Sequence, residues 1–229
     1  MDLNYLVNQI KGDTIAPTLR LRQGKVITVN ADRTMDVQIA GDTNTLPSVR
    51  YLSNYAPKPD DQVWLLNSGA DLLGVGMVAG ADRTLAPVAY RTSALTVTKD
   101  TNTYVSFQAD NSDEWGCWTV SDPTKLTVPV TGRYIATATI LFTGENSVYA
   151  SVFIEKGTQE IARTDGVMGN KSHGFHLSVT SHPVTLTKGE YLRMGVFHDY
   201  NPTLDLIVSS GGVDHTGYFN ALSLTYLGS

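Results

Sequence analysis

Cysteine is nearly absent from this chain, because Cys117 is the single one among 229 residues. One cysteine cannot form an internal disulfide, which excludes the small secreted domains that depend on disulfide bridges. Cys117 lies in the apolar sequence Trp115-Gly116-Cys117-Trp118, with no basic residue or histidine nearby in the sequence to stabilise a thiolate. We therefore expect a small buried core residue rather than a reactive thiol.

Charge is also scarce. Lys, Arg, Asp and Glu make up 17% of the residues, where about a quarter is usual, and the formal net charge is -5. No cluster of Lys and Arg occurs, so neither a nucleic-acid-binding patch nor an electrostatic membrane-surface role is predicted. The low charge and the 20 glycines are typical of turn-rich β structure and of surfaces that meet partner subunits.

Long apolar runs are missing as well. No stretch approaches the roughly 18 apolar residues of a membrane-spanning helix, so no membrane insertion is expected. Residues 1–13 have neither a basic region nor a long apolar region, which argues against a signal peptide. We expect synthesis in the cytoplasm, followed by a location outside the cell if the protein is assembled into a particle.

Helical periodicity is confined to the N-terminal segment, residues 1–22. Within it, four apolar residues of the run 2–11 recur at spacings of three and four: Leu3, Leu6, Val7 and Ile10. An isolated helix of about ten residues is marginal in water. Its apolar stripe is therefore expected to pack on the residues that follow or on a neighbouring subunit.

Residues 23–79 carry about five short runs of alternating apolar residues, separated by turn sequences. Met35, Val37 and Ile39 fall on one face of the second run, which is the period of a strand. Prolines such as Pro47 interrupt the pairing, because proline has no backbone N–H. About five strands in fewer than 60 residues predict a small closed barrel.

Residues 80–88 resemble a linker, and residues 89–229 return to strands. The run Gly132–Thr143 alternates apolar and polar residues, whereas Val148–Ile154 is apolar on both faces and is expected to be fully buried. Strands joined by Gly, Asn, Asp and Ser over about 140 residues predict a two-sheet sandwich or jelly roll. The predicted fold class is thus all-β, with a short N-terminal helix, a small barrel and a sandwich.

Two polar loops that carry aromatic residues are the candidate ligand-binding sites. Trp115 lies beside Asp113, and Tyr200 lies beside His198. Exposed aromatic rings stack on sugars and dominate binding surfaces. The alternative is that these rings belong to the core or to a subunit interface. That alternative applies above all to two further aromatic residues, Trp118 and Tyr104.

Enzyme chemistry finds little support. No Gly-x-Ser-x-Gly motif occurs, and Cys117 has no plausible base. Three carboxylates near Trp115 suit a solvated loop better than a glycosidase site: Asp110, Asp113 and Glu114. The five histidines lack a preorganised ligand arrangement, although one histidine per subunit on a trimer axis stays an alternative. We predict no enzyme activity, no cofactor and no metal site.

The barrel residues resemble the oligonucleotide/oligosaccharide-binding-type barrel in minor tail proteins of long-tailed phages of Actinobacteria. Three stretches carry most of this resemblance: Leu46–Leu52, Pro59–Leu66 and Leu72–Gly76. The resemblance implies attachment to other phage tail proteins.

The later residues resemble the trimeric jelly roll of the complement globular head and tumour-necrosis-factor superfamily. The matching stretches are Leu126–Tyr134, Leu186–Leu192 and Thr216–Leu224. The resemblance implies a homotrimer without catalytic residues.

Together the two resemblances imply a virion protein at the tail tip or baseplate, assembled in the host cytoplasm, whose jelly roll binds a host cell-surface glycan or protein. Two alternatives stay open from the sequence. One is a fibre attached to the capsid, and the other is an enzyme that degrades cell-envelope polysaccharide.

Overall fold

The computed structural model describes residues 19–68, 71–78, 85–111, 113–143, 148–168, 174–200, 203–206 and 219–228. These residues fold into strands and their connections, and no helix occurs among them. The helix predicted for residues 2–11 lies outside the described residues. Within the described part of the chain, no helix has the length and apolar character needed to cross a membrane.

The chain divides into two compact units, Met1–Ala81 and Asp82–Ser229. The division falls inside the range 80–88 that the sequence suggests as a linker. The first unit has five strands: β1 (Arg20–Val29), β2 (Thr34–Ile39), β3 (Thr45–Tyr51), β4 (Gln62–Ser68) and β5 (Asp71–Met77). The second unit has the following thirteen: β6 (Val88–Tyr90), β7 (Leu95–Thr98), β8 (Thr103–Tyr104), β9 (Ala109–Asn111), β10 (Leu126–Thr127), β11 (Gly132–Phe142), β12 (Val148–Lys156), β13 (Gln159–Met168), β14 (Phe175–Thr180), β15 (Val184–Leu186), β16 (Tyr191–His198), β17 (Thr203–Leu206) and β18 (Ala221–Gly228).

The first unit is a closed barrel with the strand order β1-β2-β3-β5-β4, in which β3 and β5 run parallel. The turn between β1 and β2 contains Arg33 with a positive φ of 66°, and Asn30 N donates to Thr34 O at 2.8 Å. Met35 and Val37 are fully buried inside the barrel, as their alternation predicts. The predicted small barrel is therefore confirmed.

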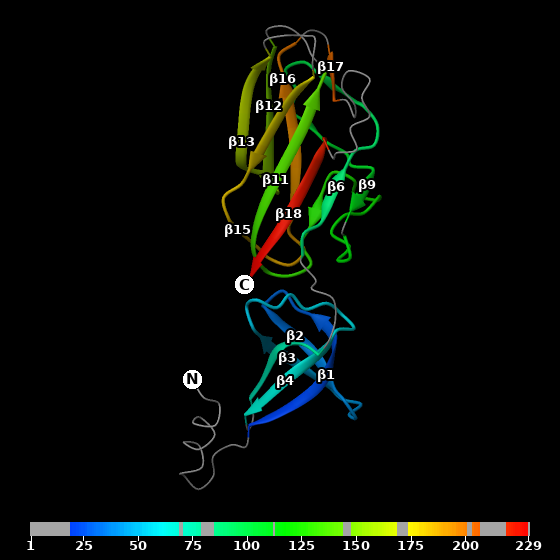
Figure 1. Ribbon diagram of the computed structural model, residues 1–229, viewed down its shortest axis with the longest axis vertical. Coiled ribbons are helices and arrows are strands. Elements are labelled where there is room, and N and C mark those ends of the chain that lie inside the picture. Colours follow the sequence, from blue (N-terminus) through cyan, green and yellow to red (C-terminus); the bar gives the residue numbers. More distant parts are fainter. Residues whose placement is uncertain are drawn as a thin grey trace. The chain divides into compact units, whose positions relative to one another are not determined.

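The second unit is a sandwich of two antiparallel sheets (Figure 1). The β16 sheet has the order β10-β16-β12-β13, with β8 also paired to β16. The β11 sheet has the order β7-β17-β11-β18-β6-β9, with β14 and β15 paired to the other side of β11. The chain passes repeatedly from one sheet to the other between β10 and β17, which is the connection pattern of a jelly roll.

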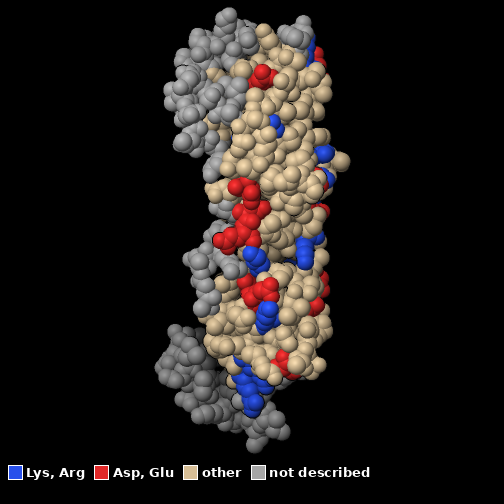
Figure 2. Space-filling model, turned by 90° about the vertical axis from the view of Figure 1, so that its right-hand side faces the viewer, with Lys and Arg blue, Asp and Glu red and all other residues tan. Residues whose placement is uncertain are grey.

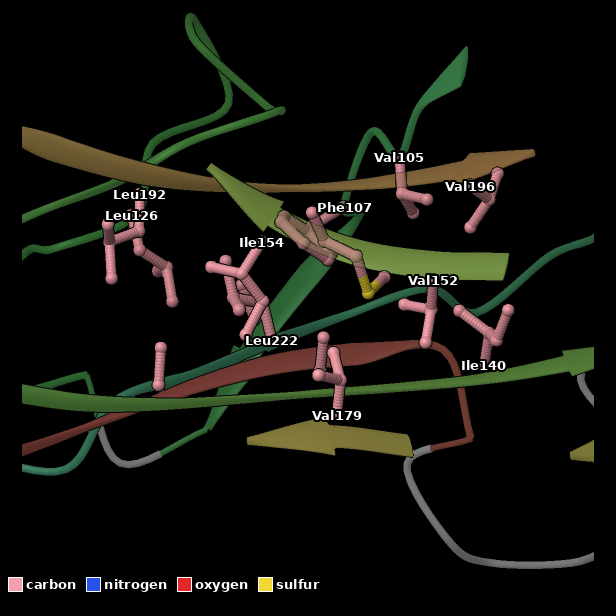
Figure 3. Packing of buried hydrophobic residues seen from close by; sticks show 14 of the residues in the cluster. Val105, Phe107, Leu126, Ile140, Val152, Ile154, Val179, Leu192, Val196 and Leu222 are labelled. Atoms are coloured by element: carbon pink, nitrogen blue, oxygen red, sulfur yellow. The ribbon is translucent and has the colours of Figure 1, made fainter. Parts of the chain in front are cut away.

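The core of the second unit lies between the two sheets. Val179 of the β11 sheet faces Val152 and Ile154 of the β16 sheet across this layer (Figure 3). Every inward residue of the predicted alternating strand is fully buried: Tyr134, Ala136, Ala138, Ile140 and Phe142. Cys117 is also buried in this cluster, so its prediction as a core residue is confirmed.

Strand β12 is buried on both faces, as the sequence predicts for Val148–Ile154. Its inner face packs in the core, while Phe153 on its outer face is fully buried by groups of the same chain. The doubly apolar pattern of this strand is thus satisfied within one chain and does not by itself require a second copy.

Candidate functional site

The outer face of the β16 sheet gathers aromatic and charged side chains that lie far apart in the sequence. Strand β16 alternates strictly: Leu192, Met194 and Val196 are buried in the core, so the residues between them point outward. Pairing with β12 and β13 places Glu155 opposite Arg193 and Phe153 opposite Arg163. Two groups of residues result on this face. In one the side chains mostly contact one another, and in the other they are partly exposed to solvent.

The closed group, which we call the arginine cluster, consists of Tyr104, Phe153, Glu155, Arg163 and Arg193. Its packing depends on Gly195, because a Cβ there would lie 2.1 Å from the Phe153 ring. The far end of the ring therefore lies against the glycine, and Tyr104 meets the ring edge-on at a centroid distance of 6.4 Å. Only glycine at this position lets the aromatic ring approach the sheet so closely.

Three polar groups of the arginine cluster satisfy one another. Arg193 Nε donates to Glu155 Oε2 at 3.0 Å, and Arg193 Nη2 donates to the Tyr104 hydroxyl at 2.9 Å. The Tyr104 hydroxyl in turn donates to Glu155 Oε2 at 3.1 Å. Burial raises the pKa of Tyr104, and its hydrogen bond to Glu155 raises that pKa further. The phenol is therefore held as a donor, and the guanidinium also stacks on its ring at 3.6 Å.

Arg163 closes the other side of the arginine cluster. Its guanidinium lies 4.8 Å from the centroid of the Phe153 ring and donates to Ser151 Oγ at 2.8 Å. Bidentate hydrogen bonds to Glu160 raise the pKa of Arg163, against the opposing effect of burial. Both arginines of the cluster thus have carboxylate partners, so the cluster has little charge left to attract an ion.

The open group, which we call the aromatic patch, consists of Tyr149, Asp165, Val167, Phe197 and Asp199. The Tyr149 and Phe197 rings are partly exposed and meet edge-on at 6.2 Å. A hydrogen bond to Asp165 raises the pKa of Tyr149, so its hydroxyl acts as a donor. Asp199 accepts a hydrogen bond from Tyr149 N at 2.9 Å, and the Val167 residue is 66% exposed. Rings beside carboxylates form a surface suited to neutral, hydroxyl-rich ligands.

Asp113, predicted as a ligand-binding residue, organises its own loop. Its two carboxylate oxygens accept hydrogen bonds from Cys117 N and Trp118 N, each at 2.8 Å. Trp115 is partly buried and packs against the core, although it keeps an accessible part. These contacts stabilise the loop, and the Trp115 side chain stays partly accessible within it.

The prediction of His198 as a ligand-binding residue is wrong, because its side chain is fully buried. Its Nε2 lies 2.8 Å from Val97 O, and its Nδ1 accepts a hydrogen bond from Tyr200 N at 3.1 Å. A carbonyl oxygen can only accept, so the proton is on Nε2. His198 thereby links β7, through Val97, to the loop that contains Tyr200, and its role is structural. Tyr200 is partly buried and packs on the core.

The two predicted loops lie at opposite ends of strand β16. Thr127 N donates to Cys117 O, and Thr127 pairs with Tyr191 at the start of the strand. Tyr200 follows the other end of the strand. Seven residue steps of about 3.3 Å separate these ends by about 23 Å. The structure therefore does not join the loops into one site, but it places the Tyr200 loop beside the aromatic patch through Asp199.

Sequence reasoning missed most of this face. It noted Tyr104, but Tyr149 was assigned only to a buried strand, and its partners lie far along the chain. Among the described residues no group of three or more histidine, cysteine or acidic side chains is placed to hold a metal ion. Two of the five histidines, 173 and 215, lie outside the described residues.

Neither a known protein family nor a curated protein matches the chain. Matches among solved structures include the globular domain of the zebrafish complement 1qA protein, which is 14% identical with a TM-score of 0.37 over 62% of this chain and 96% of that chain. The tumour necrosis factor Eiger from S. frugiperda is 11% identical with a TM-score of 0.41 over 63% of this chain and 93% of that chain.

Proposed function

We propose that this chain is a homotrimeric, non-enzymatic virion protein at the tail tip or baseplate of a long-tailed phage, whose second unit binds a glycan or protein of the host surface. The sequence resemblance of the barrel to phage minor tail proteins supports the location. The barrel order, with β3 and β5 parallel, also fits the oligonucleotide/oligosaccharide-binding type.

The observation that carries the proposal is the outer face of the β11 sheet. Strand pairing brings together nine outward residues from β6, β11, β14 and β18, none of them charged: Val88, Tyr90, Ile135, Thr137, Thr139, Ser178, Thr180, Ser223 and Thr225. Hydroxyls on this face bond to one another, as in the 3.0 Å contact between the Thr137 and Thr180 side chains. The nearest charge on β11 is Arg133, at the end of the strand.

This uncharged centre of the face is suited to contact with further copies of the chain, because burial of these nine residues leaves no ion to desolvate. Most of the described surface drawn in Figure 2 is likewise uncharged, with Lys, Arg, Asp and Glu confined to small groups. Closed cyclic symmetry lets such a face be buried in every copy. The number three follows from the resemblance of residues 89–227 to trimeric jelly rolls.

The opposite face of the sandwich would then remain free for a ligand. On it, the aromatic patch offers the edges and faces of Tyr149 and Phe197 beside the carboxylate of Asp165. Rings that stack on a sugar and carboxylates that accept from its hydroxyls suit a glycan. One such site is weak, and three linked copies raise the effective concentration.

Light scattering tests the association. A mass near three times 24.8 kDa is expected at micromolar concentration. Lysine at the exposed positions Thr180 and Thr225 should give a folded monomer, whereas Val167→Lys on the opposite face should leave the trimer intact. A wild-type mass of one chain would contradict the proposal.

Adsorption of particles to host cells tests the binding role. Tyr149→Ala should weaken each contact by about 1–2 kcal/mol, while Tyr191→Ala, at the far end of strand β16, serves as the matched control. Trp115→Ala and Tyr200→Ala test the two loops separately, with thermal unfolding as a check on folding. Normal adsorption of the Tyr149 variant would exclude the aromatic patch as the surface that binds the host. Images of intact particles would show whether the protein lies at the tail or at the capsid.

A further inference from the structure

The outside of the barrel carries a row of leucines. Leu21 of β1 pairs with Leu66 of β4, and Leu66 pairs with Leu73 of β5. The neighbouring Leu65 is fully buried, so these three leucines point outward. Leu21 is 55% exposed, and Leu19, two residues before it, is 56% exposed. Leu66 and Leu73 are partly exposed, so the row presents adjoining apolar side chains to the surface, which is typical of a contact site.

The row continues into a cavity of about 740 Å³ between β3 and β5, whose apolar lining includes Leu46, Leu66, Leu72 and Leu73. We call the row and this cavity the leucine groove. The cavity lies at a bulge in β3: Met35 pairs with Val49 and Val37 pairs with Leu46, so Pro47 and Ser48 together lie opposite Asp36 and β3 has one extra residue.

Ser48 sits at this bulge with a positive φ of 57°, and its N–H donates to Asp36 Oδ1 at 3.0 Å. That bond draws the backbone toward β2 and away from β5. The pairing of β3 with β5 that closes the barrel is short, Arg50 with Leu73 and Tyr51 with Gly74, and the cavity lies beside it. The groove is therefore built by local sequence and is not a packing defect.

We propose that the leucine groove is covered by residues 2–11 of the same chain, with the stripe of Leu3, Leu6, Val7 and Ile10 against its leucines. The point of chain entry supports this occupant. Arg20 pairs with Asn67, and Asn67 pairs with Leu72, so the N-terminal segment reaches β1 only two strands from the groove, or about 10 Å.

Length and charge also fit. A ten-residue helix, as the sequence predicts for residues 2–11, is about 15 Å long. Three strand spacings of about 4.8 Å, from β1 across β4 and β5 to β3, cover the same distance. The groove is flanked by Asp71 near the chain entry and Arg50 beyond it. In the proposed arrangement Lys11 pairs with Asp71, and Asp2 pairs with Arg50.

Cysteine cross-linking in the full chain tests this contact. Cys117 is buried, and burial raises the pKa of its thiol, so it does not interfere. Leu6→Cys combined with Leu73→Cys should form a disulfide within one chain on mild oxidation. Leu6→Cys with Ile27→Cys is the control, since Ile27 is exposed six residues along β1 from Leu21, about 20 Å away.

Mixing isotopically light and heavy chains before oxidation separates two outcomes by mass spectrometry. A disulfide only between different chains would overturn the proposal in favour of a second copy as occupant. Absence of the Leu6–Leu73 disulfide, or equal yield in the control, would overturn it as well.

A second measurement uses the trypsin site after Lys11. Leu73→Asp should uncover the segment and speed cleavage there by about tenfold or more, because cleavage follows the population of the uncovered form. Ile27→Asp should cleave like the wild type. Equal cleavage of both variants would show that the groove does not hold this segment. Neither experiment depends on the trimer or on ligand binding.

Discussion

The two outer faces of the sandwich cover the same core with opposite chemistry. The centre of the β11 sheet presents mainly hydroxyl and aliphatic side chains, with Arg133 and Asp205 near its ends, whereas the β16 sheet presents aromatic rings, two arginines and their carboxylates. On the β16 sheet, Phe153 is already buried by its own chain, while Ile135 on the other face stays partly exposed. The β16 face thus covers its largest outward ring with groups of the same chain, whereas we propose that a second copy covers the β11 face.

The largest effect on the free energy of unfolding is expected from removing the buried Phe153 ring on the β16 sheet. Phe153→Ala removes a fully buried ring and should lower the free energy of unfolding by about 3–5 kcal/mol. Ile135→Ala removes a partly exposed side chain and should mainly weaken association. Chemical unfolding and light scattering of both variants measure the two effects. Equal losses of folding stability would break the distinction between the faces.

A companion variant sharpens this prediction at Gly195. Gly195→Ala alone should destabilise the protein because the added methyl meets the Phe153 ring. Combined with Phe153→Ala, the same methyl finds free space, so the double variant should lose less than the sum of the single variants. Strict additivity would contradict the close packing of ring and glycine.

A smaller effect is expected from the ion pair of the arginine cluster. The Arg193 and Glu155 side chains are only 17% and 11% exposed. Glu155→Gln keeps the shape but leaves the arginine without its carboxylate, which should cost about 1.5–3 kcal/mol. Glu114→Gln, the same substitution at an exposed position outside the cluster, is the control and should change stability little. Urea unfolding at neutral pH measures the stability of both variants. Wild-type stability of the Glu155 variant would mean that solvent replaces the ion pair.

The smallest effect concerns Glu190 and pH. A hydrogen bond from Thr187 N lowers its pKa, helped by Lys156 at 3.0 Å and opposed by burial. A lowered pKa in the folded state gives stability that is present above the ordinary value of 4.5 and is lost as the pH falls through the lowered value. Urea midpoints between pH 6 and pH 2 should therefore fall more for the wild type than for Glu190→Gln. Parallel curves would contradict this assignment.

The candidate site was predictable only in part. The sequence predicts Asp113 and Trp115 as ligand-binding residues because polar and aromatic residues stand together in one loop, and in the structure Asp113 bonds to the backbone of that loop. It placed His198 in a binding loop, and the structure buries that residue instead. The arginine cluster escaped prediction, since Tyr104 lies 51 residues from Glu155 and 89 residues from Arg193. Nothing local in the sequence indicates such contacts.

The all-β class, the barrel, the sandwich and the inward residues of the strand Gly132–Phe142 follow from the sequence alone, because strand period and turn chemistry are local properties. Tyr134 and Ile140 are buried as their alternation requires. Only the tertiary structure decided which aromatic residues face outward together and which charges are paired. Register between distant strands sets those contacts, and register is fixed by the packing of the whole sheet.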